Sequence, residues 1–417
     1  MAYDLATIDV SDPALFQSGE WRAIFAQMRA EAPVHYCANG RNGPFWSITR
    51  YDDIYTVETD PARFSSAFEN GGIVLEDRPT KSMMQADPPL HTIERRAVRP
   101  VVTPANLKQM EGLIRTRTAH VLDNLPRGEV FDWVEDVSIE LTSLMLATLF
   151  AVPVEQRRKL THWSEVMVTD LDDPSALFHT EGERREHLME FFKFMIGLVK
   201  QRRDEPLGFD IVSIIAKSPQ FANASATELT SALANFLVGG NDTTRNTMTG
   251  AIWAFSQQPE QLEKLRADRS LMTNAEGELI RFQTPIIYMR RTATQHTVLR
   301  GQTIRKGDKV ALWYISANRD EDVFPGAERI DIERRNVRRH LSFGTGPHRC
   351  IGAPLAELQL RIFLEELLDR NLRIEVLAPP TRAYNVMAHA ISAMPVRIAA
   401  PDCGWPVHRV QKGETGR

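Results

Sequence analysis

The chain has 417 residues, of which 43% are hydrophobic and 25% charged, a balance typical of a globular protein with a large core and not of a disordered chain. A formal net charge of −4 gives no bulk attraction for nucleic acid, and the apolar runs are too short or interrupted for a membrane span. The three cysteines, Cys37, Cys350 and Cys403, are too few for a disulfide framework and fit a reducing compartment.

The first third of the chain mixes strand-like and helical patterns. Residues 1–10 carry Asp4 and Asp9 and lack an apolar core, so we expect neither a signal peptide nor a membrane anchor, and a cytoplasmic protein. Residues 45–48 predict a strand. Apolar residues then recur at three- and four-residue spacing over three predicted helices, at residues 106–125, 133–150 and 184–203.

A long central helix is predicted next. Ser225 and Glu228 form a capping box, and the apolar pattern runs past Gly239-Gly240 towards Phe255. Because a glycine pair weakens a helix interior, this pair indicates a special local requirement.

The last third of the chain contains strands, a long loop and a final helix. Residues 298–313 predict strands around a turn, and residues 320–343 form an irregular stretch of a length that is usually functional. A helix begins just after Cys350, and no internal linker is visible. We therefore predict one large domain over residues 1–400, mainly α with small β-sheets, and a polar tail over residues 401–417.

The most specific motif runs from Phe343 through Gly346 and His348 to Cys350 and Gly352. It places a cysteine at the end of a glycine-rich loop and at the start of a helix, where free N–H groups and the helix dipole stabilise a thiolate. The glycines would let the backbone approach a flat cofactor closely. A thiolate on haem iron pushes electron density onto the metal and favours O–O cleavage, so the motif predicts Cys350 as a haem ligand.

Other interpretations of the loop fit less well. A buried structural cysteine needs no such loop. A zinc site built on His348 and Cys350 lacks further ligands at workable spacing. A dinucleotide-binding fingerprint fails because Arg349 stands where the third glycine is required.

This loop resembles the haem-binding signature of the cytochrome P-450 superfamily. The resemblance covers roughly residues 7 to 400. It implies the cytochrome P-450 fold, with haem b between the long central helix and the helix after Cys350. It also implies that Cys350 binds the iron and that Phe343 and Gly346 lie at the haem.

Glu278 and Arg281 resemble the Glu-x-x-Arg motif of the same family. Residues three apart share a helix face. The resemblance implies a structural cluster with Arg334, and such a cluster is stable only when every charge is paired.

Gly239-Gly240-Asn-Asp242-Thr243 resembles the oxygen-activation motif of the family's central helix. It implies that Asp242 and Thr243 are catalytic and supply protons to the reaction. The alternative is that Thr243 bonds back to a helix carbonyl and that Asp242 lies on a solvated face.

Cations at four positions match the family's partners of the haem propionates. His91 and Arg95 lie one turn apart on a predicted helix, Arg291 follows in a strand-like run, and His348 lies in the cysteine loop. Buried carboxylates require such charge-assisted hydrogen bonds.

The regions that line the family's substrate pocket are apolar and rich in methionine here, which indicates an apolar small-molecule substrate. The candidates are Val74, Leu75, Met83, Met84, Leu177, Phe178, Leu237, Val238, Ile286, Ile287, Val386 and Met387.

Residues 8–13, 43–47, 283–291 and 313–320 resemble the bacterial alkane and fatty-acid terminal hydroxylases, which implies hydroxylation of a medium chain at its end. The sequence departs from that pattern at residues 386–391, which are expected to touch substrate. A monoterpenoid hydroxylase is the alternative. Two alternatives of another class are a haem-thiolate sensor and a peroxide-driven enzyme. A sensor would need a partner domain, and none is visible. Peroxide-driven enzymes usually lack an acid–alcohol pair such as Asp242-Thr243.

Electrons are expected to come from separate proteins, because the chain carries no flavin or iron–sulfur module. The resemblance implies a ferredoxin and a ferredoxin reductase as partners, with dioxygen as the second substrate. Arg338, Arg339 and Arg349 would then make the cysteine side basic enough to dock an acidic partner.

Overall fold

The computed structural model describes residues 3–77 and 80–399, so the tail predicted over residues 401–417, with Cys403, lies outside the described residues. The helices dominate, as predicted. They are α1 (Pro13–Ser18), α2 (Trp21–Glu31), α3 (Tyr51–Glu58), α4 (Leu90–Val98), α5 (Pro104–Asp123), α6 (Glu140–Leu149), α7 (Arg157–Val168), α8 (Glu181–Asp204), α9 (Ile211–Lys217), α10 (Ala226–Gln257), α11 (Pro259–Ala267), α12 (Met272–Gln283), α13 (Tyr314–Ala317) and α14 (Ala353–Asp369).

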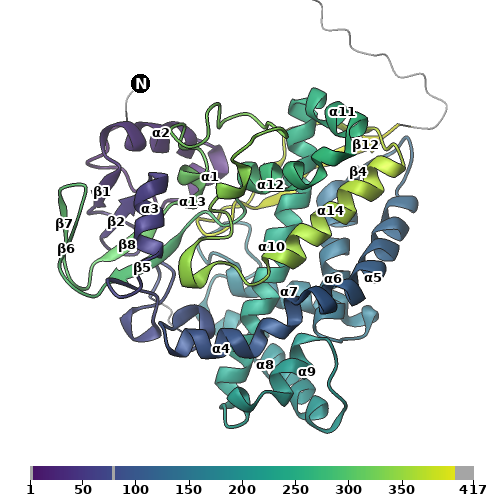
Figure 1. Cartoon of the computed structure of the whole chain (residues 1–417), viewed down its shortest axis with the longest axis horizontal. Coiled ribbons are helices and arrows are strands. Elements are labelled where there is room, and N and C mark those ends of the chain that lie inside the picture. The colour runs from purple at the N-terminus through teal and green to yellow at the C-terminus, as the bar shows by residue number, and fades with distance from the viewer. Residues whose placement is uncertain (1–2, 78–79, 400–417) are drawn as a thin grey trace, which may run out of the picture.

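The strands form small sheets at the edges of the helical body (Figure 1). A five-stranded sheet has the order β1 (Val34–Cys37), β2 (Phe45–Ile48), β8 (Lys309–Leu312), β5 (Met289–Ala293) and β3 (Phe64–Ser65). A three-stranded sheet has the order β4 (Val130–Asp132), β12 (Pro395–Ile398) and β9 (Ile374–Val376). Two pairs complete the set: β6 (Thr297–Leu299) with β7 (Gln302–Ile304), and β10 (Thr381–Arg382) with β11 (Ile391–Ala393).

Helix α10 forms the centre of the molecule and contacts α6, α7, α12 and α14 (Figure 1). The predicted capping box starts it, because Ser225 Oγ accepts from the Glu228 amide at 3.2 Å and the Glu228 carboxylate accepts from the Ser225 amide at 2.9 Å. Leu233 and Leu237 are completely buried on this helix. The helix continues without a break through Gly239-Gly240.

One predicted helix differs in detail. The segment predicted as a regular helix over residues 133–150 begins with a π-helical segment, Val134–Ile139, and becomes α-helical only at α6. Over little more than one turn, the apolar spacing does not distinguish i→i+5 from i→i+4 hydrogen bonds. Within residues 3–77 and 80–399, no helix is both long enough and apolar enough to cross a membrane.

Candidate active site

Cys350 lies at the end of a tight loop, just before α14. Its amide donates to the Phe343 carbonyl at 2.7 Å, which closes the loop over the residues between them. The side chain keeps an accessible surface although it lies deep among protein atoms. Burial raises the pKa of the Cys350 thiol, while the backbone N–H groups of Gly352 and Ala353 and the charge of Arg95 lower it. The loop therefore presents a sulfur with donors already aimed at its negative form.

The loop glycine Gly346 packs closely against the end of α3. Its φ is +63°, in the left-handed region, and a Cβ there would lie 2.4 Å from the backbone oxygen of Glu58. This close approach to the backbone of α3 requires a glycine. The expected place of Gly346 at a flat cofactor stays a prediction.

The four predicted propionate partners converge beside the cysteine loop. The rings of His91 and His348 lie 4.1 Å apart, and His91 Nδ1 and His348 Nε2 are buried without a hydrogen-bond partner among the described residues. Burial lowers the pKa of His348 far below its ordinary value, and Arg291, His91 and Arg95 lower it further. Arg95 donates to the Arg349 carbonyl at 2.6 Å.

This cationic group fits a cofactor that carries carboxylates. Buried ring nitrogens without a hydrogen-bond partner are costly, and neighbouring positive charges add to the cost unless an anion is present. Haem b supplies two propionate carboxylates and an iron that takes a thiolate. Together with the accessible Cys350 sulfur, the residues present satisfy what haem b needs.

Glu58 is a residue of this site that the sequence did not reveal. It accepts from Arg291 Nη2 at 2.8 Å, from the Thr345 amide at 2.8 Å and from the hydroxyl of Tyr314. Its side chain is 1% exposed. Glu58 ends an ordinary amphipathic helix, so nothing in its sequence context marks it as part of the cysteine loop's surroundings.

The predicted Glu278–Arg281–Arg334 cluster is assembled and fully paired. Arg281 donates to both carboxylate oxygens of Glu278, at 2.7 and 2.8 Å, and Arg334 Nε lies 3.0 Å from Glu278 Oε2. Arg281 also donates to the carbonyls of Asn318 and Ala327. The cluster thus fastens α12 to the irregular stretch that leads to the cysteine loop.

Asp242 and Thr243 lie in the middle of α10, and their contacts differ from each other. Thr243 Oγ1 donates to the Gly239 carbonyl at 2.7 Å, which is the back-bonded alternative considered above. A Cβ on Gly239 would meet no atom within 4 Å, so the helix faces open space there. Thr243, one turn further along, is half-buried.

Asp242 is held in a charged network and does not lie on a solvated face. It is 4% exposed. Its Oδ1 accepts from Arg245 Nη2 at 2.5 Å, and its Oδ2 accepts from Ser164 Oγ on α7 at 3.1 Å. Arg245 also pairs with Glu165 at 2.9 Å, and the side chain of Glu165 is 45% exposed. A chain of polar groups therefore connects Asp242 to the surface through α7.

The predicted substrate-contacting residues fall into three groups. Half-buried side chains, which keep some accessible surface, belong to Val74, Met83, Met84, Val238, Ile286 and Met387. Fully packed core positions belong to Leu75, Leu237, Ile287, Val386 and Phe178. Leu177 is 86% exposed, and its place in the pocket stays a prediction. It lies in the loop before α8, where its neighbour Phe178 is the side chain that turns inward.

Two of the predicted segments meet directly. Ile286 lies opposite Ala388 in an isolated antiparallel bridge, and the Ile287 amide donates to the Met387 carbonyl at 2.8 Å. The backbone therefore places Ile286 and Met387 in adjoining segments.

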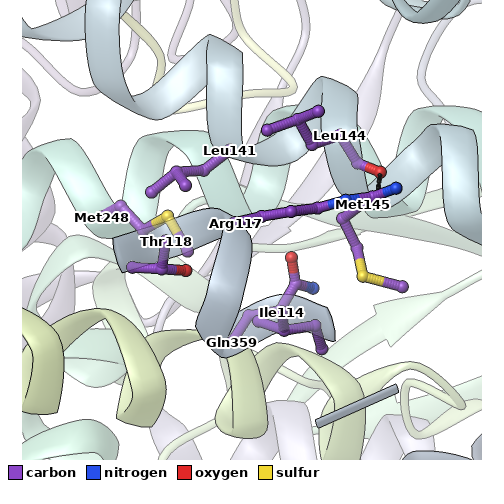
Figure 2. A pocket seen from close by; sticks show the side chains of 8 residues that line it. All are labelled: Ile114, Arg117, Thr118, Leu141, Leu144, Met145, Met248 and Gln359. Atoms are coloured by element: carbon purple, nitrogen blue, oxygen red, sulfur yellow. Dashed lines mark hydrogen bonds between the residues drawn. The ribbon is translucent and has the colours of Figure 1, made fainter. Parts of the chain in front are cut away.

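A pocket of about 20 Å³ lies between α5, α6, α10 and α14 (Figure 2). It is lined by Ile114, Arg117, Thr118, Leu141, Leu144, Met145, Met248 and Gln359. Arg117 crosses it and donates to the Leu144 carbonyl at 2.6 Å. A space of this size holds roughly one water molecule, and none of the predicted substrate residues borders it, so it belongs to the packing of the helices.

Comparison with known proteins agrees with this geometry. A model of the cytochrome P-450 family matches residues 23–382. The chain is 37% identical to linalool 8-monooxygenase of Pseudomonas putida, over 90% of this chain and 94% of that protein. It is 30% identical to a methyl-branched lipid omega-hydroxylase of Mycobacterium tuberculosis, over 89% and 90%. The solved structure of CYP153D17 from Sphingomonas sp. PAMC 26605 matches with a TM-score of 0.86 and 43% identity, over 94% and 99%.

The chain therefore belongs to the cytochrome P-450 family and is a monooxygenase. Proteins of this family bind haem b.

Proposed function

We propose that this monooxygenase hydroxylates an apolar chain of medium length, an alkane or a fatty acid, at or next to its methyl end. The observation that carries the proposal is the set of partly accessible apolar side chains from separate segments, namely Val74, Met83, Val238, Ile286 and Met387. Such a lining favours a substrate without fixed polar groups.

A constriction over the reacting position is needed, because terminal C–H bonds are stronger than internal ones. Ile286 and Met387 lie in backbone-bonded segments, and their positions are set by that bonding. Val238 precedes Gly239 on α10. These three side chains are the candidates for a narrowing that admits only the end of a chain.

Two relatives support different substrates. The similarity to a methyl-branched lipid omega-hydroxylase favours attack at the end of a lipid chain. The similarity to linalool 8-monooxygenase, at 37% identity, favours a monoterpenoid as the second candidate.

Cys350 is proposed as the axial ligand, with Phe343 and Gly346 in the loop around it and His91, Arg95, Arg291 and His348 binding the propionates. Haem b bound in this way supplies the activation of dioxygen. The two unpartnered ring nitrogens and the converging positive charges support this set.

Asp242 and Thr243 are proposed to deliver protons to the reaction. Thr243 Oγ1 holds a proton beside the open space at Gly239, and Asp242 Oδ1 connects through Arg245 to the accessible Glu165. This is a continuous route of polar atoms from the surface to the middle of α10.

A ferredoxin, reduced by its own reductase, is the proposed electron donor. Arg338, Arg339 and Arg349 are exposed on or next to the cysteine loop. Exposed cations of this kind attract an acidic partner and speed its association at low salt.

The substrate is tested with a homologous series of alkanes and fatty acids together with linalool-like terpenoids. Each buried methylene should strengthen binding by about 0.8 kcal/mol until the pocket is full, as read from the low-to-high-spin shift. Terminal or next-to-terminal alcohols should dominate the products. Mid-chain alcohols, or spin shifts with terpenoids alone, would exclude the chain-end proposal and leave the monooxygenase assignment intact.

A further inference from the structure

Glu58 is an acid placed among the cations that face the cofactor. It lies at the end of α3, where Arg291 of β5, Tyr314 of α13 and Thr345 of the cysteine loop meet it. Arg291 in turn acts on His348, whose pKa it lowers. Glu58 therefore contacts one of the four cations at close range, and it also contacts the cysteine loop.

The three partners of Glu58 are all donors. The Arg291 guanidinium and the Thr345 amide can only donate, and the Tyr314 hydroxyl donates here, so these contacts favour the carboxylate form of Glu58. Burial raises the pKa of Glu58, and these three partners lower it. Burial raises the pKa of Tyr314 well above its ordinary value, and the charge of Glu58 raises it further.

We propose that Glu58 is a positioning residue that neutralises Arg291 and thereby keeps the reduction potential of the bound haem low. The inference rests on the proposed placement of haem against Cys350 and Arg291. An unpaired positive charge beside the cofactor would favour the electron-rich ferrous state, because that state carries one more negative charge. The Glu58–Arg291 pair, 2.8 Å apart with both side chains under 5% exposed, removes that bias.

The proposal predicts the direction in which the reduction potential of the haem shifts in two single variants and in the double variant. Glu58→Gln removes the negative charge that Glu58 places against Arg291 and should raise the potential. Arg291→Gln leaves Glu58 unpaired and should lower it. The double variant contains a neutral pair and should return close to the wild-type value. Each single shift should change the ferrous-to-ferric ratio at fixed potential roughly tenfold, which is about 59 mV for one electron.

The measurement is a potentiometric titration of the full haem-loaded chain, followed in the Soret band. Tyr314→Phe is the matched control, since it removes a hydrogen bond to Glu58 and no charge, and its potential should stay near wild type. Shifts of the same sign in Glu58→Gln and Arg291→Gln, or no shift in either, would overturn the proposal. If Glu58→Gln does not load haem, a lowered potential in Arg291→Gln with a restored value in the double variant supports it, and any other result contradicts it.

The reduced carbon monoxide spectrum of the unmodified chain tests the proposed ligation of haem by Cys350 independently of the role of Glu58. If the thiolate band is present but the variants do not show the predicted potentials, the role of Glu58 is rejected and the haem ligation stands. Loss of the thiolate band in the unmodified chain rejects the proposed haem ligation itself.

Discussion

Glu276 on α12 has a buried carboxyl group whose pKa is raised to about 7. It is 4% exposed, and its Oε1 has no hydrogen-bond partner among the described residues. Burial raises the pKa of Glu276 to about 7, and Arg361 only partly opposes this effect. The residue lies two positions before Glu278, yet it takes no part in the paired cluster there.

The pH dependence follows from the sign of that shift. The folded chain holds the Glu276 proton up to about pH 7, while the unfolded chain releases it near its ordinary pKa, so stability falls as pH rises between the two. Glu276→Gln removes this loss. The free energy of unfolding of the variant should exceed that of wild type by about 1–3 kcal/mol near pH 8, and the two should differ little near pH 4. Urea unfolding at both pH values measures it.

Glu321→Gln is the matched control, because Glu321 is exposed and its removal leaves the core unchanged. Its stability difference from wild type should be the same at both pH values. An equal stability difference for Glu276→Gln at the two pH values would contradict the assignment of a raised pKa.

At the scale of elements, the contact between α7 and α10 sets the hydrogen bonds of Asp242, the residue proposed to deliver protons. Ser164 on α7 and Arg245 on α10 hold both oxygens of Asp242, so a shift of α7 changes what Asp242 bonds to. Asp242 and Thr243 are adjacent in sequence but lie in different surroundings, one in this network and the other beside open space.

Thr243→Ala should leave substrate binding nearly intact and divert reducing equivalents to peroxide, because the hydroxyl beside Gly239 is lost. Asp242→Asn should slow turnover by roughly 10²–10⁴-fold, the usual contribution of a positioned proton donor. Product formed per NAD(P)H consumed, with peroxide measured in parallel, gives both results.

Thr247→Ala is the control for Thr243→Ala. Thr247 lies one turn further along α10 and makes the same kind of back-bond, to the Thr243 carbonyl at 2.8 Å, but is buried. Its coupling should remain close to wild type. Unchanged rate and coupling in both Thr243→Ala and Asp242→Asn would exclude the proton-delivery role.

At the scale of the whole molecule, features set by neighbouring residues could be predicted from the sequence, and features set by distant residues could not. Local patterns predict the structure correctly because each depends on residues only a few positions apart. Examples are the Ser225–Glu228 capping box, the helix after Cys350 and the Glu278–Arg281 pair. The pairing with Arg334 was predicted through a family resemblance, because it joins residues more than fifty positions apart.

The residues that escaped prediction depend on tertiary contacts. Glu58 gains its role only because α3 ends against the cysteine loop, and Ser164 only because α7 packs on α10. Phe178 is buried while its neighbour Leu177 is exposed, and apolar character alone does not say which of two neighbouring side chains turns inward. The close approach of Gly346 to the backbone of α3 is another tertiary contact that no local pattern reveals.

The central claim is that Cys350 is the thiolate ligand of haem b, and the reduced carbon monoxide spectrum tests it most directly. The unmodified chain and Cys37→Ala, which removes the buried thiol far from the loop, should both give the red-shifted Soret band of thiolate ligation. Cys350→His should move the band to the position of imidazole ligation and abolish hydroxylation. A thiolate band that persists in Cys350→Ala would contradict the claim.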